Sequence, residues 1–93
     1  MKFYHASKKT LPIGESLRTP TGRSEMNVLT GGVVYLTSDV ESCKRYGTVY
    51  EIEAKDAISY KAQLKKQGRA KKARYTRNVY IALPENTKIL RRI

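Results

Sequence analysis

The feature that most limits how this chain can fold is the shortage of helix-forming sequence between its strand-like segments. Five segments are rich in the aromatic and β-branched residues typical of strands: KFYHA, VVYLTS, TVYEIEA, NVYIAL and KILRRI. Between the second and third, DVESCKRY follows a helix-start signal, Ser38 with Glu41 in capping-box spacing, and Gly47 ends it. One short helix cannot cover a parallel sheet. The sequence therefore predicts an α+β fold built on a mostly antiparallel sheet.

The length predicts a single domain over residues 1–93, with a modest core. Two prolines, two glycines and several hydroxyl residues in SKKTLPIGESLRTPTGRSE predict a long loop after the first strand. Near the other end, NVYIAL and KILRRI flank the turn sequence PENT, so these two segments predict a hairpin.

The positive charge is concentrated in the last third of the chain. Residues 1–60 hold eight Lys or Arg against seven Asp or Glu, whereas residues 61–93 hold eleven against Glu85 alone. The segment at about residues 61–77 has eight of these basic residues and no acidic one, and we expect a partly helical, partly mobile basic arm. Such asymmetry predicts an anionic partner, either nucleic acid or an acidic protein surface. The residues expected to contact it are Lys65, Lys66, Arg69, Lys71, Lys72, Arg74, Tyr75 and Arg77.

Several classes of protein are disfavoured by the composition. No segment approaches the roughly 20 apolar residues that span a bilayer, and the first residues lack the apolar run of a signal peptide, so we expect a cytoplasmic protein with no membrane partner. Cys43 is the only cysteine, which agrees with a reducing compartment, and we expect it to pack in the core. His5 is the only histidine and has no second ligand at metal-site spacing, so no metal site is predicted.

The order of five motifs gives His5 a second interpretation. FYHAS, LPIGESLRT, GGVVYLTSD, GTVYEIEA and NVYIALPENTKILRRI occur in the order and approximate spacing of an ADP-ribosyltransferase fold. The chain resembles a compressed version of the rifampin ADP-ribosyltransferase group within that superfamily. This resemblance implies a small split sheet with one or two short helices, and NAD as the cofactor in a cleft between the two parts of the sheet.

The resemblance also implies roles for individual residues. His5 would hydrogen-bond a ribose hydroxyl of NAD, the backbone of Ala6 would hold the nicotinamide amide, and Ser7 would add a hydroxyl contact. Tyr35 would stack on the nicotinamide ring. A nucleophile on the target would then capture the positively charged ribose that forms as the glycosidic bond breaks.

Two positions depart from the family pattern. Ala6 stands where the family usually has glycine, which crowds the backbone approach to the ligand. Asn78 occupies the position where many members of the wider superfamily have the catalytic glutamate. Asparagine can hydrogen-bond a ribose hydroxyl but brings no negative charge, a loss worth about 10²- to 10³-fold in rate. The remaining carboxylates near the later strands are Glu51, Glu53, Asp56 and Glu85.

Two functions from different classes follow. The first is a mono-ADP-ribosyltransferase that uses NAD and modifies a nucleic acid or a nucleic-acid-associated protein, with Tyr35 and Asn78 at the catalytic positions and the basic arm docking the target. The second is a non-catalytic basic module, of the kind made by phages and mobile elements, that binds nucleic acid or inhibits a host complex. A ribonuclease is a third alternative, for which the sequence offers no paired acid and base.

Overall fold

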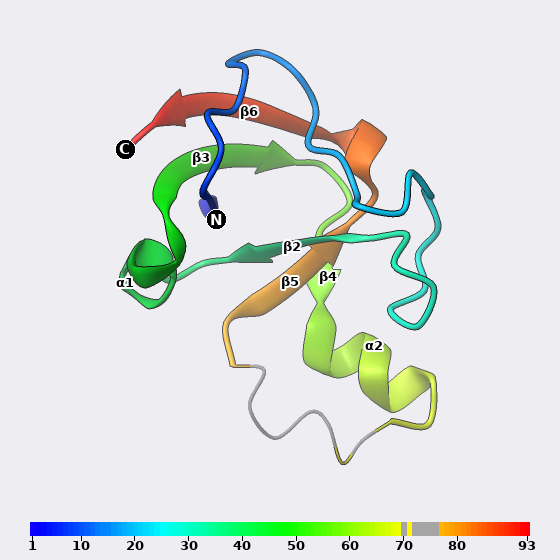
Figure 1. Cartoon of the computed structure of the whole chain (residues 1–93). Helices are drawn as coiled ribbons and strands as arrows, with labels where there is room; N and C mark the ends of the chain where they lie inside the picture. The colour runs from blue at the N-terminus through cyan, green and yellow to red at the C-terminus, as the bar shows by residue number, and fades with distance from the viewer. Residues whose placement is uncertain (70, 72–76) are drawn as a thin grey trace.

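A computed structural model gives the positions of residues 1–69, 71 and 77–93. Figure 1 shows a curved sheet with a short helix on the left and a second helix below it. The elements in chain order are β1 Phe3–Ser7, β2 Val34–Thr37, α1 Val40–Cys43, the 3-10 turn η1 Lys44–Tyr46, β3 Thr48–Ala54, β4 Ile58–Ser59, α2 Tyr60–Lys66, β5 Val79–Ala82, the 3-10 turn η3 Pro84–Asn86 and β6 Thr87–Arg92.

The six strands form one sheet in the order β4-β5-β2-β1-β3-β6, and every strand pairing is antiparallel. This confirms the α+β class and the antiparallel sheet expected from the sequence. The two middle strands, β1 and β2, are joined by the fewest paired residues, because Tyr4 and Thr37 form the single register pair between them. By contrast, five pairs join β1 to β3 and four join β2 to β5. The sheet therefore consists of two three-stranded halves that meet at a narrow seam.

The expected strands all form, but the hairpin expected at the end of the chain was wrong. β5 pairs with β2 and β4 in one half of the sheet, whereas β6 pairs with β3 in the other half. The η3 turn carries the chain from one half to the other, and Asp56 holds this turn by accepting hydrogen bonds from the Leu83 amide and the Asn86 side chain. A turn sequence between two strands does not say whether they pair with each other. Here the two strands pair with strands from earlier in the chain and not with each other.

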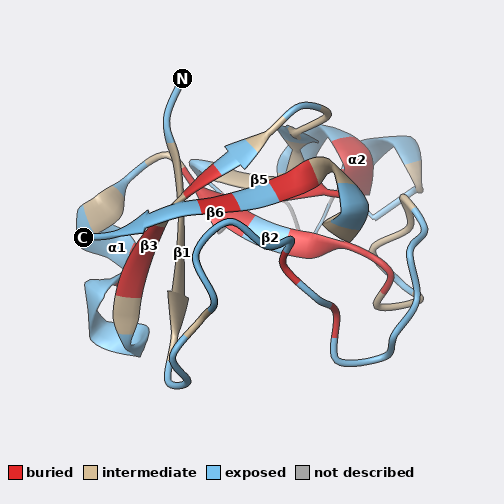
Figure 2. Cartoon of the chain, turned by 90° about the horizontal axis from the view of Figure 1, so that it is seen from above, coloured by how far each residue is buried: buried red, intermediate tan, exposed pale blue. Residues whose placement is uncertain are grey.

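The core lies on one face of the sheet beneath the long loop between β1 and β2. Val34, Leu36, Tyr50, Ile52 and Ile89 form a buried cluster to which the loop adds its own apolar residues. The loop is fixed by polar contacts as well: its Leu11 amide donates to the Tyr50 hydroxyl and its Leu17 amide to Thr87 Oγ1. In Figure 2 buried residues appear along β2 and β3, at the end of β5 and in the first half of β6. The opposite face of the sheet is thus left to the two helices.

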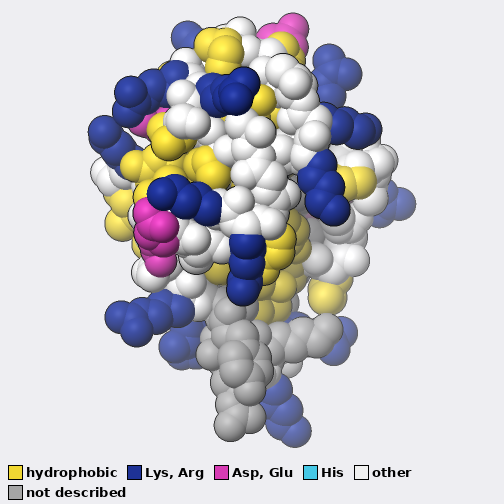
Figure 3. All heavy atoms as spheres, turned by 60° about the vertical axis from the view of Figure 1, so that its left-hand side comes forward, with side chains coloured by type: hydrophobic (Ala, Val, Ile, Leu, Met, Phe, Trp, Pro, Cys, Tyr) yellow, Lys and Arg dark blue, Asp and Glu magenta, His cyan; other side chains and the backbone are white. Residues whose placement is uncertain are grey.

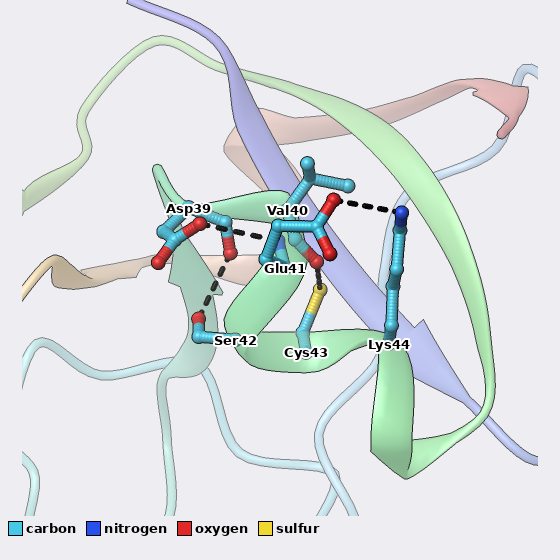
Figure 4. Close-up of polar contacts among 6 residues, drawn as sticks. All are labelled: Asp39, Val40, Glu41, Ser42, Cys43 and Lys44. Atoms are coloured by element: carbon cyan, nitrogen blue, oxygen red, sulfur yellow. Dashed lines mark hydrogen bonds and ion pairs between the residues drawn. The ribbon is translucent and has the colours of Figure 1, made fainter.

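The helix predicted after β2 is present, with a different cap. Asp39 is the N-cap residue, and its Oδ1 accepts from the Glu41 amide at 3.1 Å (Figure 4). The capping box of Ser38 and Glu41 was therefore wrong; Glu41 instead forms an ion pair with Lys44 at 2.8 Å. Asp39 has the extended φ and ψ of an N-cap residue, and its carboxylate accepts hydrogen bonds as well as a serine hydroxyl does. Gly47 ends the segment, as expected.

The basic arm is partly helical, as the sequence predicts. Its helix, α2, begins at Tyr60 after the Ser59 cap, whose hydroxyl accepts from the Ala62 amide. Gln63 and Leu64 are buried, the Gln63 side chain donates to the Met26 carbonyl of the long loop, and α2 contacts β5. No helix in the described part of the chain is long and apolar enough to cross a membrane.

We predict that Gly47 is required for the junction of η1 and β3. Its φ of 144° lies in the region that favours glycine, and a Cβ there would meet the Ser7 carbonyl oxygen at 2.5 Å. Gly47→Ala therefore combines a backbone cost of about 1–3 kcal/mol with a clash against β1. Thermal unfolding measures the effect, at about 4–8 °C per kcal/mol for a domain of this size.

Gly22→Ala is the matched control, because Gly22 has a φ of 71° but open space around its missing Cβ. We expect Gly47→Ala to lower the unfolding midpoint by clearly more than Gly22→Ala does. Equal effects in the two variants would contradict the role given to the contact with Ser7.

Candidate functional site

A groove of about 380 Å³ opens where β1 and β2 separate. Its lining comes from β1, β2, the start of β5, α1 and η1. Arg77, which precedes β5, also contributes to the lining. The lining residues are Tyr4, His5, Ala6, Tyr35, Leu36, Thr37, Ser42, Cys43, Arg45, Tyr46, Arg77 and Val79. Segments far apart in the sequence therefore meet in one concave site.

His5 reaches across the seam from β1 to β2. Its Nδ1 lies 2.9 Å from the carbonyl oxygen of Tyr35. A carbonyl oxygen can only accept, so Nδ1 carries a proton and donates to it. In the neutral imidazole, Nε2 is then left without a proton and can accept a hydrogen bond from a ligand hydroxyl. One contact thus joins the two halves of the sheet and determines which ring nitrogen of His5 donates and which accepts.

Tyr35 is held by a second tyrosine that the sequence analysis did not single out. The rings of Tyr35 and Tyr60 pack edge to face, with 5.3 Å between their centroids. Tyr35 nevertheless remains 41% exposed, so part of its ring stays open to a ligand. Burial, together with the nearby Tyr60 phenol, raises the pKa of Tyr35 above 10.0, so its hydroxyl stays protonated and neutral. Tyr60 is the first residue of α2 and connects the helical part of the arm to the groove.

The other predicted NAD contacts lie at or beside the groove. Ala6 is part of its lining. Ser7 ends β1 next to it, and its hydroxyl accepts from the Lys9 amide at 3.1 Å. Cys43 is buried, as expected, and its thiol donates to the Val40 carbonyl. Burial, above all, raises the pKa of this thiol. These contacts make Cys43 part of the wall formed by α1 (Figure 4).

Asn78 has a conformational reason for its identity. Its φ is 61°, and among the described positions no other residue except glycine has a positive φ. Asparagine adopts this left-handed conformation more readily than most residues. Its carbonyl oxygen accepts from the Ser38 amide at 3.2 Å, which ties the start of β5 to the end of β2. Asn78 thus lies directly between two lining residues, Arg77 and Val79.

The carboxylates considered in the sequence have other partners. Glu51 forms an ion pair with Arg91 at 3.0 Å, and Asp56 binds the backbone and side chain around η3. Glu85 is hydrogen-bonded to Ser24, and Glu53 lies opposite Lys88 in the register of β3 and β6. Among the described residues, no Asp or Glu lines the groove. Its charged lining is cationic, from Arg45 and Arg77.

Arg45 and Tyr46 form a feature that sequence reasoning missed. The Arg45 guanidinium lies 4.9 Å from the centroid of the Tyr46 ring, and its Nη2 donates to the Tyr46 hydroxyl at 2.9 Å. Tyr46 is 55% exposed. The adjacent Arg-Tyr pair in the sequence was the available signal, although only the fold brings this pair into the same groove as His5 and Tyr35.

The residues expected to contact a target divide into three groups. Lys65 and Lys66 are exposed on α2, and Arg69 and Lys71 are exposed after it. Arg77 instead lines the groove, so one end of the basic arm lies at the candidate site itself. The other three predicted contacts, Lys72, Arg74 and Tyr75, lie outside the described residues.

Comparison of this chain with protein-family models, with curated proteins and with solved structures finds no match.

The contact between Tyr35 and Tyr60 predicts a measurable effect on proton binding. Tyr60→Phe keeps the ring but removes the phenol oxygen, so we expect the pKa of Tyr35 to fall toward its ordinary value of about 10 while the effect of burial remains. NMR of isotope-labelled tyrosine rings across an alkaline pH series measures it. An unchanged titration of Tyr35 would contradict the contact.

The same raised pKa predicts how stability depends on pH. An unfolded tyrosine ionises near pH 10, before Tyr35 does in the folded protein, so its contribution to stability is present below about pH 10 and lost as pH rises through the folded pKa. Tyr35→Phe removes this contribution. Denaturant unfolding of both proteins should therefore show a steeper loss of stability above pH 10 in the parent, and parallel curves would contradict the expectation.

Proposed function

We propose that the protein is an ADP-ribosyltransferase-like protein that binds NAD in the groove between the two halves of its sheet. The observation that carries the proposal is the contact between His5 Nδ1 and the Tyr35 carbonyl, which leaves His5 Nε2 as an acceptor beside an exposed tyrosine ring. The resemblance of the five sequence motifs to the rifampin ADP-ribosyltransferase group is independent support, because it pairs the same two residues.

The chemistry of NAD fits the lining. A ribose hydroxyl can donate to His5 Nε2, and a flat nicotinamide ring can stack on Tyr35. Arg45 and Arg77 supply positive charge suited to a diphosphate. The backbone of Ala6 borders the same space, and its methyl narrows the approach compared with glycine. When bound, NAD supplies an ADP-ribose group whose bond to nicotinamide can be broken by a nucleophile of the target.

The cationic lining also sets a limit on the rate of such a transfer. A carboxylate near the ribose would stabilise the positive charge that develops there, and no described carboxylate lines the groove. Asn78 can offer an amide contact from the edge, where its backbone is fixed by Ser38. We therefore expect a slow transferase, acting on a nucleic acid or a protein bound to one.

The cationic lining of the groove also favours one alternative function, a non-catalytic binding module. A groove whose charged lining is arginine suits a binding module that holds a phosphate-bearing ligand without turning it over. In that case NAD or a nucleic acid would bind with no release of nicotinamide.

An NAD titration followed by NMR, with nicotinamide release read on the same sample, separates these functions. We expect His5→Ala to weaken binding by about tenfold, because a hydrogen bond that leaves its partner unpaired typically costs about 1–3 kcal/mol. Tyr35→Ala should weaken binding similarly, whereas Tyr35→Phe should retain most of it because the ring is kept.

Lys55→Gln is the control, since Lys55 lies beside Glu85 in a separate depression of the surface. Binding with release supports the transferase, and binding without release supports the non-catalytic module. If neither His5→Ala nor Tyr35→Ala alters the affinity for NAD, the groove is not the NAD site and the proposal is wrong.

A further inference from the structure

The outer face of α2 carries a row of cations with no acidic residue among them. Lys61, Lys65 and Lys66 are exposed, while the inward side of the helix is buried. Arg69 follows the helix, and its amide donates to the Leu64 carbonyl at 2.7 Å, so its backbone is tied to the last turn. Lys61, Lys65 and Arg69 are spaced four residues apart. Lys61 and Lys65 therefore lie on one side of α2, and Arg69 follows its last turn; these three residues are called the α2 cation row.

Neighbouring acids do not neutralise this row. The nearest acidic residues along the chain are Asp56 and Glu85, and both are engaged elsewhere, with η3 and with Ser24. The ion pairs of the described residues, Lys44 with Glu41 and Arg91 with Glu51, involve other cations. Like charges four residues apart repel on a helix, and a bound polyanion would relieve this repulsion.

Tyr60 connects the α2 cation row to the groove. Tyr60 precedes Lys61 directly, and its ring packs on Tyr35 in the groove. Arg77 lines the groove, as does the pair of Arg45 and Tyr46. Figure 3 shows the side of the molecule that carries α1, where Lys and Arg side chains far outnumber Asp and Glu. Cations are therefore present both on the exposed side of α2 and in the lining of the candidate site.

We propose that this surface binds single-stranded nucleic acid. The α2 cation row and Arg77 contact successive phosphates, and the exposed ring of Tyr46 stacks on one unpaired base at the groove wall. The inference names the target class for the proposed transferase and to that extent rests on it, although the binding itself needs no NAD.

An exposed aromatic ring decides between the anionic partners. An acidic protein surface would be held by the cations alone, whereas the exposed ring of Tyr46 adds a flat surface for a base. In a duplex the bases are already stacked on each other and cannot reach a ring in a groove of about 380 Å³. Single strands present bases and phosphates together, and so match both features.

Fluorescence anisotropy with a labelled single-stranded oligonucleotide of about ten nucleotides tests the proposal. We expect Lys61→Gln with Lys65→Gln to lower the slope of log affinity against log salt by about 1.4, which is the loss of two phosphate contacts on a single strand. Tyr46→Ala should lower affinity about fivefold or more. Lys55→Gln with Lys88→Gln removes the same charge beside Glu53 and Glu85, and should leave the slope within about 0.5 of the parent.

Three results would overturn the inference. The first is that the two double variants change the salt slope equally. The second is that a duplex of the same sequence binds as tightly as the single strand. The third is that polyglutamate displaces the labelled oligonucleotide as well as unlabelled oligonucleotide of equal charge does. The last result would indicate an acidic protein partner instead. Because Lys61 and Lys65 lie outside the groove, their double variant should keep NAD binding. Failure of nucleic-acid binding and failure of NAD binding are therefore distinguished.

Discussion

The hydrogen bond from His5 Nδ1 to the Tyr35 carbonyl is the contact on which the candidate site depends. β1 and β2 share only the register pair of Tyr4 and Thr37, so the two strands separate soon after they meet. The imidazole then takes the place of a backbone partner for the Tyr35 carbonyl. His5 and Tyr35 both line the groove, so this contact lies within the candidate site itself.

Each wall of the groove is attached to this seam by local chemistry. On one side, Asp39 caps α1, and Gly47 allows the chain to turn from η1 into β3 against Ser7. On the other side, Tyr60 packs on Tyr35 and brings the start of α2 to the groove. The site is thus built from elements that also stabilise the sheet. Substitutions in the walls are expected to affect stability and binding together.

Much of the fold was readable from the sequence because it depends on local patterns. The strands around His5, Tyr35 and Tyr50 have the β-branched and aromatic content that pleated structure favours, and Gly47 ends its helix as expected. The sequence did not reveal which strands β5 and β6 pair with. Those partners depend on the burial of Ile81 in one half of the sheet and of Ile89 in the other. Similarly, His5 and Tyr35 were identified through a resemblance, whereas Tyr60, Arg45 and Tyr46 required the fold to bring them to the groove.

We propose that His5 holds its proton on Nδ1 and offers Nε2 to the ribose of NAD. Long-range proton–nitrogen NMR of the single histidine measures this directly at a pH where the ring is neutral. We predict that Nδ1 carries the proton in the free protein and that addition of NAD shifts the Nε2 resonance while this tautomer is kept. A proton on Nε2, or an Nε2 resonance that does not move at saturating NAD, would contradict the account.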